Sequence, residues 1–131
     1  MQNRNQFLVP LKSFALIVSI AALTVSVGSA QTVWLAGSGD WNDSLNWSAG
    51  LPNSTSAVLI TNTGAKVITV SAATPEAVRA ARRMDLAGFI GATNTLRLDN
   101  LGVGPFQLAN SFNLDFGSRL EISSSFMILD G

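Results

Sequence analysis

The chain has 131 residues with eight basic and eight acidic side chains, and it contains no histidine and no cysteine. These absences exclude His-dependent triads, thiol nucleophiles and the usual zinc sites, and they leave no disulfide to stabilise the fold. Because no basic stripe is present, nucleic acid is not an expected partner.

Residues 1–30 have the pattern of a cleavable export signal. Arg4 and Lys12 precede an apolar run over 14–27, and small residues follow as far as Ala30. The run of about 14 residues is short for a membrane span, which needs roughly 20. We therefore predict cleavage after Ala30 and a secreted or cell-surface protein that meets the membrane only during export; an uncleaved anchor is the alternative.

The remaining chain is predicted to form one small domain of two parts. Residues 31–56 are a tryptophan-rich capping segment, and residues 57–131 are a region of β-strand repeats. Six basic and eight acidic residues leave residues 31–131 with a net charge of −2.

All three tryptophans lie in the capping segment, among Gly, Asn, Asp and Ser residues that favour turns. A buried indole removes roughly 200 Å² from water, so we expect the rings to anchor this loop and cover the domain's end. The alternative is an exposed platform on which sugar rings stack, with an asparagine beside it. Either interpretation uses the same candidate residues, which are Trp34, Trp41, Asn46 and Trp47.

Strand signals continue along the chain. Residues 32–35, 57–61 and 66–71 are rich in β-branched and apolar side chains. From Ala92 onward apolar residues alternate with polar ones, and turn residues such as Asn110-Ser111 separate the runs. The final run, over 126–129, is apolar throughout, which predicts a strand covered on both sides. The alternating apolar positions are Leu96 and Leu98, Phe106 and Leu108, Phe112, Leu114 and Phe116, and Leu120 and Ile122.

Residues 75–84 favour one short helix. Thr74 can cap its start, Pro75 suits the first helical position, and three arginines lie towards the negative end of the helix dipole. The alternative is an extended segment leading into residues 84–86. These arginines, Arg79, Arg82 and Arg83, form the one basic cluster of the sequence. We expect them on a solvated face; the alternative is that they contact an acidic polymer.

A faint internal repeat indicates how the strands are arranged. Residues 94–99 match residues 118–123 at an offset of 24, and each copy holds two apolar residues separated by a charged one. Repeats of 20–30 residues built from short strands are typical of the coils of a solenoid. A small antiparallel β-sandwich is the alternative.

Part of the capping segment resembles a known family. Gly39-Asp-Trp41, Asn46-Trp47 and Gly50-Leu-Pro52, followed by residues 57–60, are similar to the N-terminal signature of secreted bacterial autotransporter-associated β-strand repeat proteins and related sorting-tail surface proteins. The resemblance implies a right-handed parallel β-helix after the signal peptide. Ser54 to Ser56 replace an acid that is frequent in the family. No sorting tail precedes Gly131, so we expect the C-terminus to be truncated.

Candidate chemistry is sparse. Asp40, Asn42 and Ser44 match the start of a calcium loop, but leucines stand where such a loop needs its glycine and its glutamate. Paired carboxylates can cleave glycosides, although acids in turns are more often simply solvated. The candidate pairs are Asp40 with Asp43 and Asp115 with Glu121. We predict no catalytic residue, metal or cofactor.

The sequence thus predicts an all-β protein, a short parallel β-helix with a tryptophan cap. Its predicted role is that of an exported, adhesin-like structural protein, or an N-terminal fragment of one, without catalysis. A small secreted carbohydrate-binding module using the tryptophans is the alternative. Expected partners are a surface polysaccharide, or a second copy bound through the exposed last coil.

Overall fold

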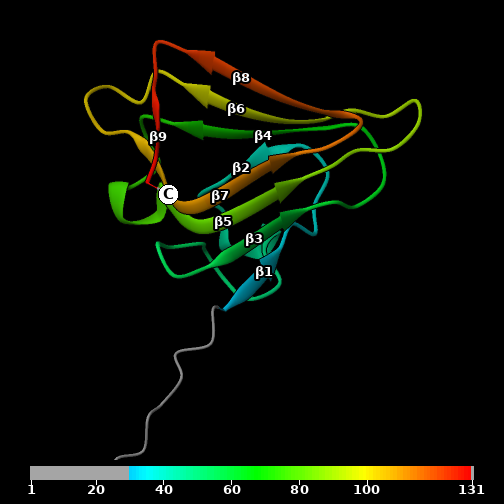
Figure 1. Ribbon diagram of the computed structural model, residues 1–131, viewed down its shortest axis with the longest axis horizontal. Coiled ribbons are helices and arrows are strands. Elements are labelled where there is room, and N and C mark those ends of the chain that lie inside the picture. Colours follow the sequence, from blue (N-terminus) through cyan, green and yellow to red (C-terminus); the bar gives the residue numbers. More distant parts are fainter. Residues whose placement is uncertain (1–29, 131) are drawn as a thin grey trace, which may run out of the picture.

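The computed structural model describes residues 30–130, which form two parallel β-sheets facing each other (Figure 1). One sheet has the order β1-β3-β5-β7-β9 and the other β2-β4-β6-β8. The chain alternates between the sheets, so consecutive strands form coils and each coil stacks on the one before. The strands are β1 Gln31–Val33, β2 Gly39–Asp40, β3 Ala57–Ile60, β4 Lys66–Ser71, β5 Ala80–Leu86, β6 Asn94–Asp99, β7 Phe106–Leu114, β8 Ser118–Ser123 and β9 Met127–Leu129.

This arrangement is a β-solenoid and confirms the predicted short parallel β-helix. Every ladder between named strands is parallel, which rules out the antiparallel sandwich. The helical elements of the described residues are two single 3₁₀ turns, η1 (Ser44–Asn46) and η2 (Glu76–Val78). Neither of them is long and apolar enough to cross a membrane.

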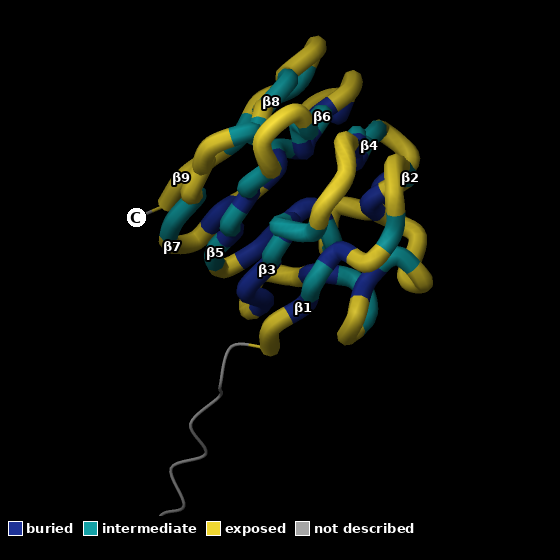
Figure 2. Tube along the Cα trace, turned by 90° about the vertical axis from the view of Figure 1, so that its right-hand side faces the viewer, coloured by how far each residue is buried: buried dark blue, intermediate teal, exposed yellow. Residues whose placement is uncertain are grey.

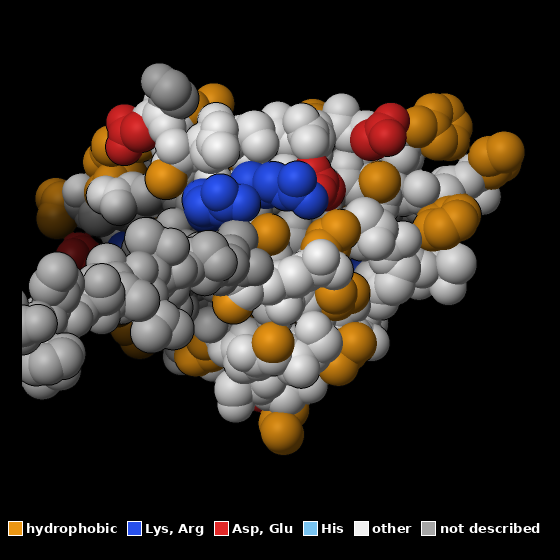
Figure 3. Space-filling model, turned by 60° about the horizontal axis from the view of Figure 1, so that its bottom comes forward, with side chains coloured by type: hydrophobic (Ala, Val, Ile, Leu, Met, Phe, Trp, Pro, Cys, Tyr) orange, Lys and Arg blue, Asp and Glu red, His pale blue; other side chains and the backbone are white. Residues whose placement is uncertain are grey.

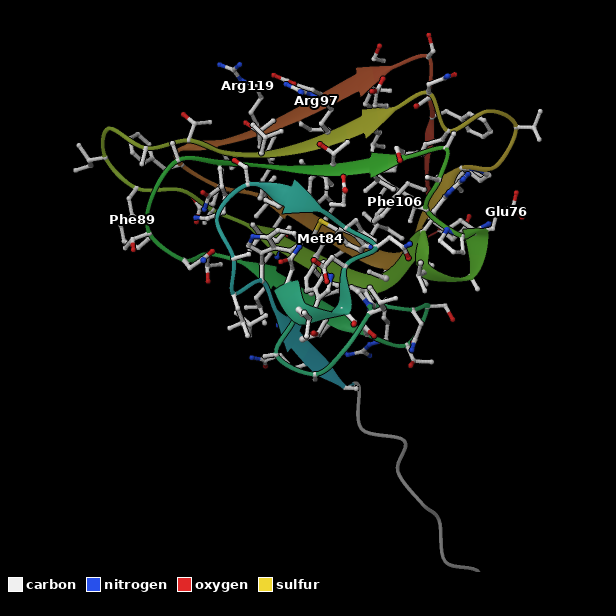
Figure 4. The ribbon with its side chains drawn as sticks, turned by 180° about the vertical axis from the view of Figure 1, so that it is seen from behind. Glu76, Met84, Phe89, Arg97, Phe106 and Arg119 are labelled. Carbon is white, nitrogen blue, oxygen red and sulfur yellow. The ribbon has the colours of Figure 1, made fainter. Side chains whose placement is uncertain are left out.

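Alternating side chains place apolar rows between the sheets. In β4 the even-numbered residues point inward and are buried, whereas the odd-numbered ones are half-buried on the outer face. Ile68 aligns with Leu96 and Leu120 in successive coils. Such rows build one continuous core, visible as the dark-blue stretches of the strands from β3 to β7 in Figure 2. Met84 and Phe106, labelled in Figure 4, belong to this core.

The two copies of the 24-residue repeat are β6 and β8, which pair with each other in register. Asn94 aligns with Ser118, and the pairing continues residue by residue to Asp99 with Ser123. The matched residues therefore occupy the same place in two consecutive coils. Leu96 and Leu98 point into the core from β6, next to Leu120 and Ile122 of β8.

The predicted helix over 75–84 is wrong. A single 3₁₀ turn covers Glu76–Val78, and the chain is extended from Ala80 onward, as the alternative expected. The reason is tertiary, because β5 lies between β3 and β7 and its backbone groups complete both ladders. Arg79 is also not on a solvated face, since only 6% of it is exposed.

Two further strand expectations need correction. Asn110-Ser111 does not form a turn but lies inside β7, where the register against β5 shifts between Ala81 and Arg83. One extra residue of β7 is accommodated there, as in a β-bulge. The last strand, β9, is not covered on both sides: Ile128 and Leu129 are 37% and 59% exposed.

Buried cations hold both corners of the solenoid. At the first corner, Lys66 donates hydrogen bonds from Nζ to the carbonyls of Asn62, Thr63 and Gly64 at 2.8–2.9 Å and to Oδ1 of Asn94 at 3.0 Å. At the second, the Arg79 guanidinium donates to four loop carbonyls, those of Ala72, Thr74, Leu101 and Gly104. These bonds pair the turn carbonyls at each corner with a cation that is itself buried. Burial lowers the pKa of Lys66.

Candidate functional site

The three tryptophans lie together at the N-terminal end of the core. Trp34 and Trp41 are fully buried and Trp47 is 4% exposed. Trp47 contacts the other two rings edge-on, with centroids 4.9 Å from Trp34 and 4.7 Å from Trp41. Trp41 also meets Phe106, at the start of β7, at 5.1 Å. The cluster therefore links the first coil to the fourth through aromatic packing.

Each indole N–H has a backbone acceptor. Trp34 Nε1 donates to the carbonyl of Gly37 at 2.8 Å, and Trp47 Nε1 donates to the carbonyl of Trp41 at 2.8 Å. Trp41 Nε1 donates to the carbonyl of Val78 at 2.7 Å, across 37 residues of sequence. Because these rings are buried and their polar atoms are paired, they offer no exposed indole face on which a sugar ring could stack.

Asn46 has a structural position beside the tryptophans. Its Nδ2 donates to the carbonyl of Asp40 at 3.1 Å. A Cβ built on Gly39 would lie 3.0 Å from Asn46 Nδ2 and 3.6 Å from a ring carbon of Trp34. Gly39 thus allows Asn46 and Trp34 to approach the backbone closely. The structure brings all four predicted residues together, as parts of one packed end.

The segment after η1 covers the edge of the first strand. Leu35 N donates to the carbonyl of Asn46 at 2.8 Å, and Ser48 N donates to the carbonyl of Val33 at 2.9 Å. Trp34 and Trp47 form an antiparallel bridge between these bonds. Thr32 Oγ1 also donates to the carbonyl of Gly50. The outer edge of β1 is therefore paired within the same chain.

Three of the four predicted acids, Asp43, Asp115 and Glu121, make contacts that serve local structure. Asp43 accepts a hydrogen bond from Leu45 N at 3.0 Å and caps η1. Asp115 accepts one from Phe116 N at 2.7 Å in the β7–β8 turn. Glu121 accepts hydrogen bonds from Arg97 at 2.8 Å and Arg119 at 3.2 Å, and these bonds hold its pKa below the usual 4.5. The two arginines project from the same sheet face in Figure 4.

Hollows mark the described surface, and one of about 270 Å³ lies between Glu76, Ala77, Gly104, Pro105 and Gln107. A small one of about 200 Å³ contains Asp40, Asn42 and Asp43 beside Ser71 and Thr74. The described residues contain no group of three or more His, Cys, Asp or Glu side chains placed to hold a metal ion. The residues of the calcium-like pattern lie in a short polar loop, in which Leu45 is 86% exposed.

A larger hollow is an open groove of about 580 Å³, which sequence reasoning missed. It lies at the ends of β3, β5 and β7, with apolar walls from Leu59, Phe112 and Leu114. Asp85 and Asp115 both line the groove. Asp85 is 3.3 Å from Arg83 and accepts a hydrogen bond from Asn113 at 2.5 Å. No sequence signal reveals this groove, because its walls come from three coils whose alignment only the fold defines.

The face shown in Figure 3, on which the β1 end of the stack comes forward, is mixed in character. Apolar side chains are dispersed among polar ones, and Lys and Arg side chains form one compact group next to an acidic one. Such a face is typical of a solvated sheet surface rather than of a large apolar docking site.

Comparison of the chain with family models, with curated proteins and with solved structures gave no match. The resemblance to autotransporter-associated repeat proteins therefore stays a prediction from the residues of the capping segment.

Proposed function

We propose that the protein is an exported structural module of a bacterial cell surface, adhesin-like in kind and without catalysis. The observation that carries this proposal is the use of its polar and aromatic residues: the indoles and the buried cations hold the coils together, and the Arg97–Glu121 pair joins two of them. A body of stacked coils presents side chains on extended, regular faces. The export pattern of residues 1–30, nearly all of which lie outside the described residues, supports the proposed location.

A test of export uses the full chain expressed from its own start codon in a bacterium. We expect protein outside the cytoplasm, with the mass of a chain that begins at Gln31. A Leu16→Arg variant, which places a charge in the apolar run, should stay unprocessed in the cytoplasm. Wild-type protein found in the cytoplasm with residues 1–30 attached would refute the export claim.

The carbohydrate-binding alternative makes a separate prediction. A tryptophan platform needs exposed rings, whereas Trp34, Trp41 and Trp47 are at most 4% exposed. We expect blue-shifted tryptophan emission that a panel of soluble polysaccharides leaves unchanged. Red-shifted emission that moves during titration would favour the carbohydrate-binding module instead.

A further inference from the structure

The two ends of the solenoid differ in how they finish. At the N-terminal end, the tryptophan cluster closes the core and the segment after η1 pairs with the edge of β1. Among residues 30–130, nothing equivalent covers the opposite end, which is formed by β8, β9 and the second half of β7. We call this surface the C-terminal face.

Three apolar rows lose their cover at the C-terminal face. Ile60 and Leu86 are fully buried, but the next member of their row, Leu114, is 52% exposed. Val70 and Leu98 are fully buried, while Ile122 is 50% exposed. Leu108 is buried, and Leu129 after it is 59% exposed. Open strand edges next to such rows are templates for pairing with another strand.

The free edge of β8 presents the backbone N–H and C=O groups of alternate residues. The carbonyls of Gly117 and Ser123 accept hydrogen bonds from the β6 side, from Asn94 N and Asn100 N. Backbone groups alternate in direction along a strand, so the N–H and C=O groups of the even-numbered residues, Leu120 among them, point away from β6. These groups can pair with an antiparallel copy of the same strand.

The charges of β8 select one register for that pairing. If two copies of β8 meet antiparallel about Leu120, Arg119 of each copy lies opposite Glu121 of the other. These are non-hydrogen-bonded pairs, whose side chains approach most closely. Shifting the centre to residue 121 places two Glu121 carboxylates opposite each other, which is unfavourable.

The second sheet fits the same two-fold axis. β9 pairs only with Phe106–Leu108, so the edge of β7 from Ser111 to Leu114 is open. A two-fold axis perpendicular to both sheets through Leu120 reverses the strand direction and keeps each sheet in its own layer. The partner's β9 then falls over the open half of β7 and covers Leu114. Because a two-fold contact uses the same face of both copies, it closes as a dimer and does not propagate.

We propose that the C-terminal face binds a second copy of this chain, with the two β8 strands antiparallel about Leu120. This inference does not depend on the export proposal, because it rests on the edges, apolar rows and charges of the described residues. The dimer continues both sheets and joins the two cores.

Charge reversal tests the register. Arg119→Glu and Glu121→Arg each place like charges opposite one another in a homodimer, so sedimentation should show dimers weakened about tenfold or more. The first variant carries acidic side chains at both positions 119 and 121, and the second carries basic ones. In an equal mixture, the acidic side chains of one chain lie opposite the basic side chains of the other, so dimerisation should return. Arg82→Glu, an exposed charge reversal on the central strand β5, is the matched control and should dimerise normally.

A cysteine cross-link gives a second readout that does not depend on charge. The chain has no cysteine, and Leu120→Cys places two sulfurs at the two-fold axis, with Cα atoms about 5.5 Å apart, within disulfide reach. We expect covalent dimers on oxidation, whereas Val103→Cys, 93% exposed on a loop, should give far fewer. A wild-type monomer at all concentrations, assemblies that keep growing, or a variant mixture that fails to re-associate would overturn the proposal.

Discussion

Trp41 is the residue on which the tryptophan cap depends most, because it connects three parts of the chain. Its ring is fully buried, lies 4.7 Å from Trp47 and 5.1 Å from Phe106, and donates its N–H to the carbonyl of Val78 at 2.7 Å. Trp41→Ala removes all of these interactions together. The substitution therefore tests whether the cap stabilises the coils behind it.

The size of the effect follows from the interactions that the truncated ring no longer makes. Truncation of a buried tryptophan to alanine costs about 3–5 kcal/mol in other proteins. The two edge-on ring pairs that Trp41 forms, with Trp47 and with Phe106, contribute about 0.5–1.5 kcal/mol each. The Val78 carbonyl, left without its donor, adds about 1–3 kcal/mol unless water reaches it. A domain of about 100 residues has a total stability of about 5–15 kcal/mol, so the variant should be close to unfolding.

Urea denaturation followed by far-UV circular dichroism measures this destabilisation. Trp41→Phe keeps an aromatic ring but lacks the N–H, so it should be less stable than wild type by about 1–3 kcal/mol. Leu45→Ala is the matched control, because Leu45 lies in the same loop and is 86% exposed. A destabilisation of Trp41→Ala that is no larger than that of Leu45→Ala would refute the role of the indole in holding the cap.

Other variants test the corners and the outer face. Gly88→Ala should destabilise the fold by about 3 kcal/mol in the same urea titration, because its Cβ would lie 1.8 Å from the carbonyl oxygen of Gly117. Gly37→Ala is the control and should be neutral or slightly stabilising, because a Cβ at this position would have nothing within 4 Å. Arg79→Met should lower the thermal midpoint, because it removes donors from four loop carbonyls; a midpoint equal to wild type would contradict that role. The pKa of Glu121 is lowered in the folded protein, so its contribution to stability is present above the usual pKa of 4.5 and disappears as the pH falls through the folded value. The difference between wild type and Glu121→Gln should therefore shrink in acid, and a difference that grows in acid would contradict this sign.

The strands with a clear composition or repeat could be predicted from the sequence. Lys66–Ser71 is rich in β-branched residues and forms the predicted strand, and the match of residues 94–99 with 118–123 already contained the register of β6 against β8. The packing of the tryptophans followed from their size and from the length of the loop that they anchor. In these places the local pattern and the tertiary structure favour the same conformation.

Prediction failed where long-range contacts decide the conformation. The caps and alanines of residues 74–81 favour a helix, but pairing with β3 and β7 and the buried hydrogen bonds of Arg79 hold the chain extended. Asn110-Ser111 has turn composition, yet both residues lie within β7 at a register shift. The groove beside Asp85 and the Lys66–Asn94 corner are formed by separate coils, so no local pattern reports them.

The stacking of parallel coils is the central claim, and engineered disulfides test it most directly. Thr69, Arg97 and Glu121 occupy one outer row in consecutive strands of the second sheet. Neighbouring strands are about 4.8 Å apart, whereas strands two apart are separated by about 10 Å, beyond disulfide reach. We expect Thr69→Cys with Arg97→Cys to form an intramolecular disulfide in high yield, and Thr69→Cys with Glu121→Cys to form almost none. Equal yields for the two pairs, or no disulfide in the first, would contradict the parallel register of the coils.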